Sequence, residues 1–88
     1  MKYNLVDYFD VWFNDEEGYF VNDLTHTDII IDISDDDSNE DIINKLVDAG
    51  YLSHEAIGRV VVEWIDEYMI EIFKFDNGEP LGRLEKVN

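Results

Sequence analysis

One segment of this chain has helical periodicity, and runs of β-branched and aromatic residues flank it on both sides. Ser38 precedes Asp41 by three residues, as in a capping box, and Gly50 stands where a left-handed residue commonly ends a helix. Apolar residues recur between these positions at helical spacing, at Ile42, Ile43, Leu46 and Val47. The pattern predicts a single helix over about residues 39–49, and it leaves strands to supply the rest of the fold.

Three strands are expected before the helix. The segment KYNLVDYFDVWF, residues 2–13, has one mostly apolar face that only Asp7 interrupts. The turn NDEEG follows, with Gly18 available for a positive φ, and YFVND then reads as the return strand. The segment TDIIIDIS, residues 27–34, alternates isoleucine with polar residues and predicts the third strand.

Three more strands are expected after the helix, at residues 59–65, 68–75 and 80–87, and residues 51–58 read as a loop or short turn. Asn77-Gly78 predicts a type I′ hairpin between the last two strands, and Asp66-Glu67 is a weaker turn signal. We therefore expect one α+β domain over residues 1–88. It would be a mostly antiparallel sheet of five to six strands, in the order βββ-α-βββ, with one helix packed on one face.

Four aromatic residues are expected to fill the space between the sheet and the helix rather than to stack on a ligand. They are Trp12, Trp64, Phe73 and Phe75.

Charge is the outlying property of the composition. The 88 residues include 22 Asp and Glu against 6 Lys and Arg, a formal net charge of −16. A hydrophobic content of 45% argues for a folded core and against disorder. Such charge repels nucleic acid and anionic membranes and favours a basic partner. The acidic surface of a salt-adapted protein is an alternative, but the chain has only two alanines, which suggests AT-rich coding rather than a GC-rich halophile.

The chain has no cysteine, so it can form neither disulfides nor thiolate metal sites, and a reducing compartment fits. The first ten residues do not resemble a signal peptide, and the longest apolar runs are too short to span a bilayer. A cytoplasmic location is expected.

The acidic stretch DISDDDSNED suggests a calcium loop, but its spacing does not fit one. A loop starting at Asp32 would have Asp37 at the glycine position and Ile43 at the position of the bidentate glutamate. A start at Asp35 fails at the same two positions. No metal ligands are predicted, although a weak, irregular cation site stays open as an alternative.

The sequence offers little for catalysis. His26 and His54 are the only histidines, and both are expected on the surface or in loops. Ser53, His54 and Glu55 are sequence neighbours, which does not establish the geometry of a catalytic triad. The glycines form no phosphate-binding loop. We expect no catalytic residues and no cofactor, and hence a protein that is not an enzyme.

Three acidic groups are the candidate partner-binding residues. They are the helix-start cluster Asp35, Asp36, Asp37, Glu40 and Asp41; the turn cluster Asp15, Glu16 and Glu17; and Asp66 with Glu67. The helix dipole favours one or two carboxylates at a helix start, so this cluster has more carboxylates than the helix needs. The surplus suggests a functional role. Carboxylates two residues apart on a strand lie about 6.6–6.8 Å apart, close to the spacing of neighbouring phosphates. A solvated face without a partner is the alternative.

The segment KYNLVDYFDVWFN…EEGYFVND resembles small uncharacterised proteins encoded by phages and mobile elements of low-GC bacteria. The similar order of turn, helix and hairpin extends this resemblance over most of the chain. In size and acidity the chain also resembles phage-encoded DNA mimics, which include antirestriction and anti-CRISPR proteins. That second likeness is one of composition, and neither resemblance brings an activity or site residues with it.

The leading hypothesis is therefore an inhibitor from a phage or mobile element. It would occupy the basic nucleic-acid channel of a host defence protein, such as a CRISPR effector or a restriction enzyme, with carboxylates in place of phosphates. The alternative is an accessory module that binds a basic partner without mimicry, or that forms a homodimer through an exposed sheet edge.

Overall fold

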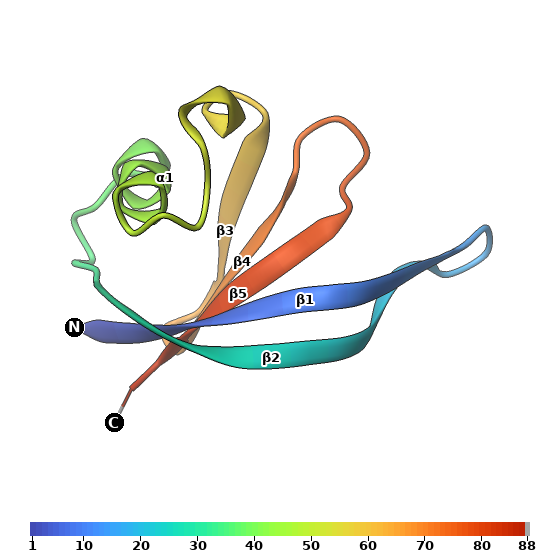
Figure 1. Ribbon diagram of the computed structural model, residues 1–88, viewed down its shortest axis with the longest axis horizontal. Coiled ribbons are helices and arrows are strands. Elements are labelled where there is room, and N and C mark those ends of the chain that lie inside the picture. Colours follow the sequence, from blue (N-terminus) through green and yellow to red (C-terminus); the bar gives the residue numbers. More distant parts are fainter. Residues whose placement is uncertain (88) are drawn as a thin grey trace.

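The computed structural model describes residues 1–87, which form a five-stranded antiparallel sheet with one α-helix on one face (Figure 1). The elements are β1 (Lys2–Asn14), β2 (Gly18–Asp32), α1 (Asn39–Asp48), the 3₁₀ turn η1 (His54–Ala56), β3 (Val60–Asp66), β4 (Met69–Lys74) and β5 (Pro80–Lys86). The strand order across the sheet is β2-β1-β5-β4-β3. The predicted α+β class, with an antiparallel sheet and one helix, is confirmed.

The predicted second and third strands are one continuous strand, β2. It pairs with β1 along almost its whole length, from Asn14↔Gly18 to Lys2↔Asp32. Residues 24–26, which were expected to separate the two strands, stay in β2 because they pair with Tyr8, Asp7 and Val6 of β1, and irregularities in the register accommodate them. The chain therefore has the order ββ-α-βββ within the described residues, and the predicted third strand before the helix was wrong.

The hydrophobic core lies between α1 and the sheet. The helix contributes Ile42, Ile43 and Leu46. The sheet and the segment after β2 contribute Tyr3, Leu5, Ile31, Ile33, Val60, Val62, Ile70, Ile72 and Leu84. Each large apolar side chain buried there contributes about 1.5–3 kcal/mol.

Of the four aromatic residues predicted to fill this core, only Trp64 packs against it, with its ring edge-on to Tyr3 at a centroid distance of 5.9 Å. Trp12 and Phe75 are 55% and 69% exposed, and Phe73 is partly buried outside the core cluster. Trp12 lies on a part of β1 that extends past β5, and Phe75 lies in the loop after β4. The prediction was wrong for these three residues. Neither the extension of β1 nor the length of the loop is a local property of the sequence, and Phe73 follows the buried Ile72 and so points to the other face of the sheet.

The helix begins and ends as its sequence predicts. The Ser38 hydroxyl accepts a hydrogen bond from the Asp41 amide at 3.1 Å, and the Asp41 carboxylate accepts one from the Ser38 amide at 3.0 Å. At the other end Gly50 has a φ of 84°, and the amides of Gly50 and Tyr51 donate to carbonyls of the last turn.

The β4–β5 hairpin forms as predicted, but its turn is not type I′. Residues 75–79 form the loop, and only Gly78 among them has a positive φ, of 75°. The Asn77 side chain instead accepts a hydrogen bond from the Glu79 amide at 2.9 Å. A type I′ turn joins two strands through two residues that both have positive φ. Here the loop has five residues, and only one of them has positive φ.

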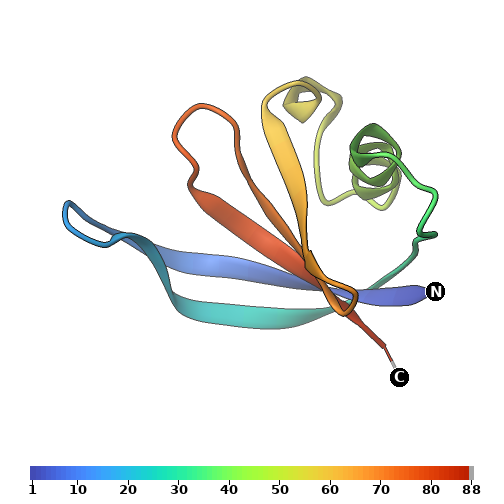
Figure 2. The ribbon, with the colours of Figure 1, turned by 180° about the vertical axis from the view of Figure 1, so that it is seen from behind.

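The β1–β2 hairpin extends beyond the rest of the sheet. β5 pairs with β1 only from Tyr3 to Asp7, so the outer half of the hairpin continues as a two-stranded ribbon (Figures 1 and 2). We call residues 9–23 the arm and the remaining described residues the body. The arm gives the molecule its long axis, with overall extents of 36 × 28 × 22 Å.

Candidate functional site

The structure brings two of the predicted acidic groups together at one end of the body. A hollow of about 300 Å³ beside Trp64 is lined by Asp35, which follows β2, by Asp66, the last residue of β3, and by Glu67, in the turn to β4. We call this the acidic hollow. The Tyr3 hydroxyl donates to the Glu67 carbonyl at 2.9 Å, and burial, with these three carboxylates adding to it, raises the pKa of Tyr3.

Two carboxylates of the helix-start cluster have structural roles. The Asp37 carboxylate accepts hydrogen bonds from Lys45 Nζ at 2.6 Å and from the Ser34 amide at 2.9 Å. The hydrogen bond from Lys45 is the main reason that the pKa of Asp37 lies below its usual value. Asp41 belongs to the capping box. These two residues hold the helix start in place, although Asp41 is exposed. The other three residues of the cluster are exposed as well, namely Asp35, Asp36 and Glu40.

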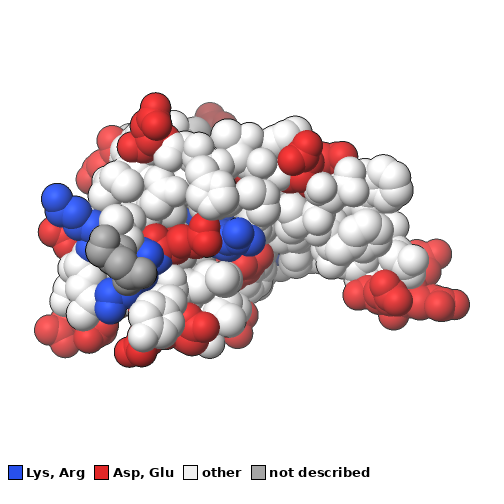
Figure 3. Space-filling model, turned by 90° about the horizontal axis from the view of Figure 1, so that it is seen from below, with Lys and Arg blue, Asp and Glu red and all other residues white. Residues whose placement is uncertain are grey.

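The third predicted group lies at the opposite end of the molecule. Asp15, Glu16 and Glu17 are exposed at the tip of the arm, where the Asn14 side chain accepts hydrogen bonds from the Glu16 and Glu17 amides. Figure 3 shows these acidic residues as a separate cluster at the end of the arm, remote from the acids on the body. The predicted acidic surface is therefore not one patch but two.

Few of the carboxylates are neutralised from within the molecule. In the described part of the chain, ion pairs engage the carboxylates of only four residues, Asp32, Asp37, Glu79 and Glu85. Of the predicted partner-binding residues, Asp37 alone is paired in residues 1–87. The other nine are exposed, and their charge is left to solvent or to a partner.

A polar cluster on the sheet face opposite the helix was not predicted. The Tyr8 hydroxyl donates to the Glu71 carboxylate at 3.1 Å, and the Arg83 guanidinium lies 5.8 Å from the centre of the Tyr8 ring. Beside them His26 Nε2 lies 3.0 Å from the Glu85 carboxylate. Burial raises the pKa of Glu71, and it is also the main cause that raises the pKa of Tyr8 to about 12.

Strand register explains why this cluster was missed. Glu71 and Arg83 are opposite each other in the β4–β5 pairing, and Arg83 is opposite Val6 in the β1–β5 pairing. Alternation places each residue on a face, but only the pairing of distant strands shows which residues meet there. His26, expected on the surface or in a loop, is exposed on strand β2.

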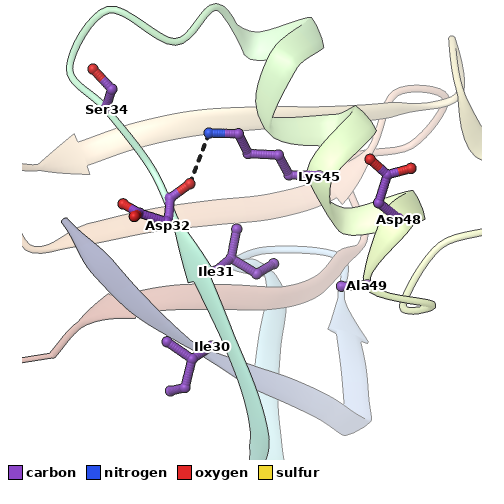
Figure 4. A pocket seen from close by; sticks show the side chains of 7 residues that line it. All are labelled: Ile30, Ile31, Asp32, Ser34, Lys45, Asp48 and Ala49. Atoms are coloured by element: carbon purple, nitrogen blue, oxygen red, sulfur yellow. Dashed lines mark hydrogen bonds between the residues drawn. The ribbon is translucent and has the colours of Figure 1, made fainter.

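A groove lies between the end of β2 and α1 (Figure 4). Lys45 reaches from the helix to the Asp32 carbonyl at 2.8 Å, and the same ammonium group binds the Asp37 carboxylate. The Lys45 ammonium group therefore links α1 to the end of β2. Ser34 and Asp48 also line the groove. No histidine is among the lining residues, so this hydroxyl and this carboxylate do not form part of a catalytic triad.

In residues 1–87, no three histidine, aspartate or glutamate side chains are grouped as a metal site would require. The stretch that suggested a calcium loop instead forms the turn and cap of α1. Of the described helices, none has the length and apolar character needed to cross a membrane.

Comparison with protein-family models, with curated proteins and with solved structures finds no match.

Proposed function

We propose that this protein is a non-enzymatic inhibitor that occupies the basic nucleic-acid channel of a host defence protein. The observation that carries the proposal is the pair of exposed acidic clusters at opposite ends of an elongated domain, which its own cations leave largely unpaired in residues 1–87. Carboxylates of this kind form strong bidentate hydrogen bonds with arginine, as phosphates do. The body cluster consists of Asp35, Asp36, Glu40, Asp66 and Glu67, and the arm cluster of Asp15, Glu16 and Glu17.

The dimensions of the molecule suit this role. Its longest extent is 36 Å, and one turn of B-DNA is about 34–36 Å long. Acidic clusters at the two ends of such a domain can contact cations that are spaced to bind phosphates one helical turn apart. The turn and cap hydrogen bonds of Asn14, Ser34 and Ser38 fix the backbone beside both clusters, so little conformational entropy is lost on binding.

The resemblance of the sequence to proteins of phages and mobile elements supplies the biological setting of the proposal. The protein would act in the cytoplasm of the host cell, against a CRISPR effector or a restriction enzyme. Inhibition would be stoichiometric and would need no chemical step. Because the contacts are between charged groups at exposed surfaces, binding would weaken steeply as salt is added.

The test is an inhibition assay with purified CRISPR effectors and restriction enzymes. We expect one protein per enzyme to block nucleic-acid binding and cleavage, and excess nucleic acid to restore them. The body-cluster variant combines Asp35→Asn, Asp36→Asn, Asp66→Asn and Glu67→Gln. The control removes the same charge from scattered exposed sites through Asp28→Asn, Asp48→Asn, Glu55→Gln and Asp76→Asn.

We expect the body-cluster variant to lose inhibition and the control to keep most of it. Asp37 stays unchanged in both variants, because its loss would leave Lys45 without its carboxylate and disturb the helix start. Equal losses in the two variants would mean that only total charge matters. The absence of inhibition by the unmodified protein at stoichiometric excess across the panel would refute the proposed function.

A second candidate function is that of an interaction module that associates through a sheet edge. The observation that favours it is β2, a strand of 15 residues that lies at the edge of the sheet. A partner strand bound there would leave nucleic acid without effect on the complex. Sedimentation of the protein alone tests self-association, and a monomer at all concentrations would exclude the homodimer.

A further inference from the structure

The arm is an apolar ribbon that has no core of its own. Trp12 and Phe20 are paired across its two strands with their rings 6.1 Å apart, and Phe13 and Tyr19 are paired at 4.9 Å. Successive residues of a strand point to opposite faces, so one aromatic pair lies on each face. The helix covers neither face, because it packs on the body (Figure 1).

The aromatic side chains of the arm are exposed to an extent that a small domain rarely shows. Four of them are between 41% and 60% exposed, namely Phe9, Trp12, Phe13 and Phe20. Figure 3 shows the arm as a largely uncharged projection that ends in the acidic tip. An isolated two-stranded ribbon is marginally stable in water, and a contiguous exposed apolar surface commonly marks an interaction site.

Carboxylates border these rings, and the sequence of the arm contains neither lysine nor arginine. The acidic residues are Asp10, Asp15, Glu16, Glu17 and Asp23. The Asp10 carboxylate also fixes one face, since it accepts hydrogen bonds from Trp12 Nε1 at 2.8 Å and from the Asn22 side chain at 2.7 Å. The arm thus presents ordered aromatic rings beside negative charge. A second copy of the arm would meet this surface with the same charge, which disfavours self-association.

Aromatic rings beside negative charges are also what a single-stranded nucleic acid presents to a protein. Grooves that bind single strands without sequence preference stack the bases on aromatic or arginine side chains and bind the phosphates with lysine and arginine. Indole and phenyl rings stack on the same groups, and tryptophan gives the strongest cation–π contacts. Carboxylates can take the place of the phosphates in binding arginine.

We propose that the arm binds in the single-strand groove of its partner, with its rings in the place of bases and its carboxylates in the place of phosphates. This inference rests on the proposed function and deepens it, because it assigns the arm as the part that enters the groove, while the body cluster contacts cations outside it. Among the proposed targets it singles out proteins that hold single-stranded nucleic acid, and against these double-stranded nucleic acid is a poor competitor.

The two tryptophans of the chain allow a direct test, since Trp12 lies in the arm and Trp64 lies beside the acidic hollow. Incorporation of fluorotryptophan gives one fluorine NMR signal for each, and the Trp64→Phe variant assigns them. The probe is a purified single-stranded-DNA-binding protein of the OB-fold type. We expect the Trp12 signal to shift or broaden more than the Trp64 signal on titration, and excess oligothymidylate to reverse the change.

A pair of variants measures the contribution of the rings. Phe13→Ser with Phe20→Ser should weaken binding to the same probe by about tenfold or more, as the loss of aromatic anchors does. The control, Phe75→Ser with Ile57→Ser, removes apolar side chains of comparable exposure from the body and should leave affinity unchanged. Circular dichroism and thermal unfolding establish that both variants are folded.

Three results would overturn the inference. A response of Trp64 without one of Trp12 would show that the acidic hollow makes the contact, and the proposed function would stand without the arm. A shift of Trp12 that depends on the concentration of the protein alone would make a second copy the occupant. An unchanged Trp12 signal at saturating probe would show that the arm does not recognise this kind of groove. The inhibition assay judges the proposed function separately.

Discussion

The arm and the body both consist of strands rich in apolar and aromatic residues, but they differ in which elements pack on those strands. Strand β1 runs through both: Leu5, in the body, is fully buried, whereas Phe13, in the arm, is 60% exposed. Apolar and aromatic residues recur in both parts of the strand. The body has α1 above its sheet and β5 beside β1, and the arm has neither. Burial is therefore decided by the second layer and not by the pattern of the strand.

The comparison predicts first that a core change in the body costs far more stability than a ring removed from the arm. Leu46→Ala should lower the free energy of unfolding by about 2–5 kcal/mol, because Leu46 is fully buried in the core. Phe13→Ser should change it by less than about 0.5 kcal/mol, as exposed substitutions do. Urea unfolding of both variants measures the difference. A large loss in the Phe13→Ser variant would mean that the arm contributes to the cooperative fold.

The second prediction uses a close approach that exists only in the body. A methyl group at Gly82 would lie 2.6 Å from the Val6 carbonyl oxygen and 2.7 Å from the Tyr51 hydroxyl. Gly82→Ala should therefore cost about 1–3 kcal/mol, as overpacking does. At Gly18, in the arm, an added methyl group meets nothing within 4 Å. Thermal unfolding gives the cost of Gly82→Ala.

The Gly82→Ala change in a Tyr51→Phe variant shows whether the clash with the Val6 carbonyl or the clash with the Tyr51 hydroxyl dominates. Tyr51→Phe removes the hydroxyl that bonds to Asp7 at 3.0 Å and to the Leu81 carbonyl at 2.9 Å. If Gly82→Ala costs as much in this background as alone, the clash with the Val6 carbonyl is responsible. A negligible cost in both backgrounds would contradict the packing described for this part of the sheet.

The third prediction compares two side chains that each accept hydrogen bonds from backbone amides. Ser38→Ala should cost about 1 kcal/mol, since it removes the cap of the helix that covers the core. Asn14→Ala removes the acceptor of the Glu16 and Glu17 amides at the tip of the arm, and it should leave the global free energy of unfolding unchanged. Hydrogen exchange should instead show faster opening of the arm. Equal global costs would remove the distinction between arm and body.

The fourth and smallest effect concerns the partly buried Glu71 of the body. Burial raises its folded-state pKa above the value of about 4.3 expected for an unfolded chain, while Tyr8 and Arg83 oppose this and Glu63 adds to it. The folded protein thus binds more protons at Glu71 than the unfolded chain does. This stability is present below about pH 4.3 and is lost as the pH rises through the folded-state pKa.

Glu71→Gln should accordingly raise the melting temperature at pH 7, and the gain over the unmodified protein should shrink as the pH falls towards 4. The glutamine carbonyl can still accept the hydrogen bond from the Tyr8 hydroxyl. Melting curves at a series of pH values measure the gain. A gain of the same size at pH 7 and pH 4 would mean that packing, rather than ionisation, limits stability at this position.

The local features of the fold could be predicted from the sequence. The capping box at Ser38 and Asp41, the glycine that ends the helix and the strands β1, β3, β4 and β5 all depend on neighbouring residues. The wrong predictions depended on distant ones. Residues 24–26 remain in a strand because β1 pairs with them, and Trp12 is exposed because β5 ends its pairing at Asp7.

The candidate site divides in the same way. The excess of carboxylates was evident from the sequence, but the meeting of Asp35 with Asp66 and Glu67 depends on the arrangement of β2, β3 and β4 in space. The role of Asp37 depends on Lys45, which lies eight residues later and donates a hydrogen bond to the Asp37 carboxylate. The exposure of the arm could not be predicted locally, because aromatic residues on both faces of a strand do not tell whether another layer covers them.

The central pairing of β1 with β5 has a consequence for the rate at which this protein folds. The hairpin β1–β2 and the meander β3–β4–β5 are each local in sequence, but Tyr3 pairs with Lys86, so the two units join only when opposite ends of the described chain meet. Contacts between residues so far apart in sequence slow folding to about milliseconds to seconds. During synthesis, the nascent β1–β2 hairpin must wait for β5 to leave the ribosome, with its apolar face uncovered until then. The high density of negative charge keeps such waiting chains apart.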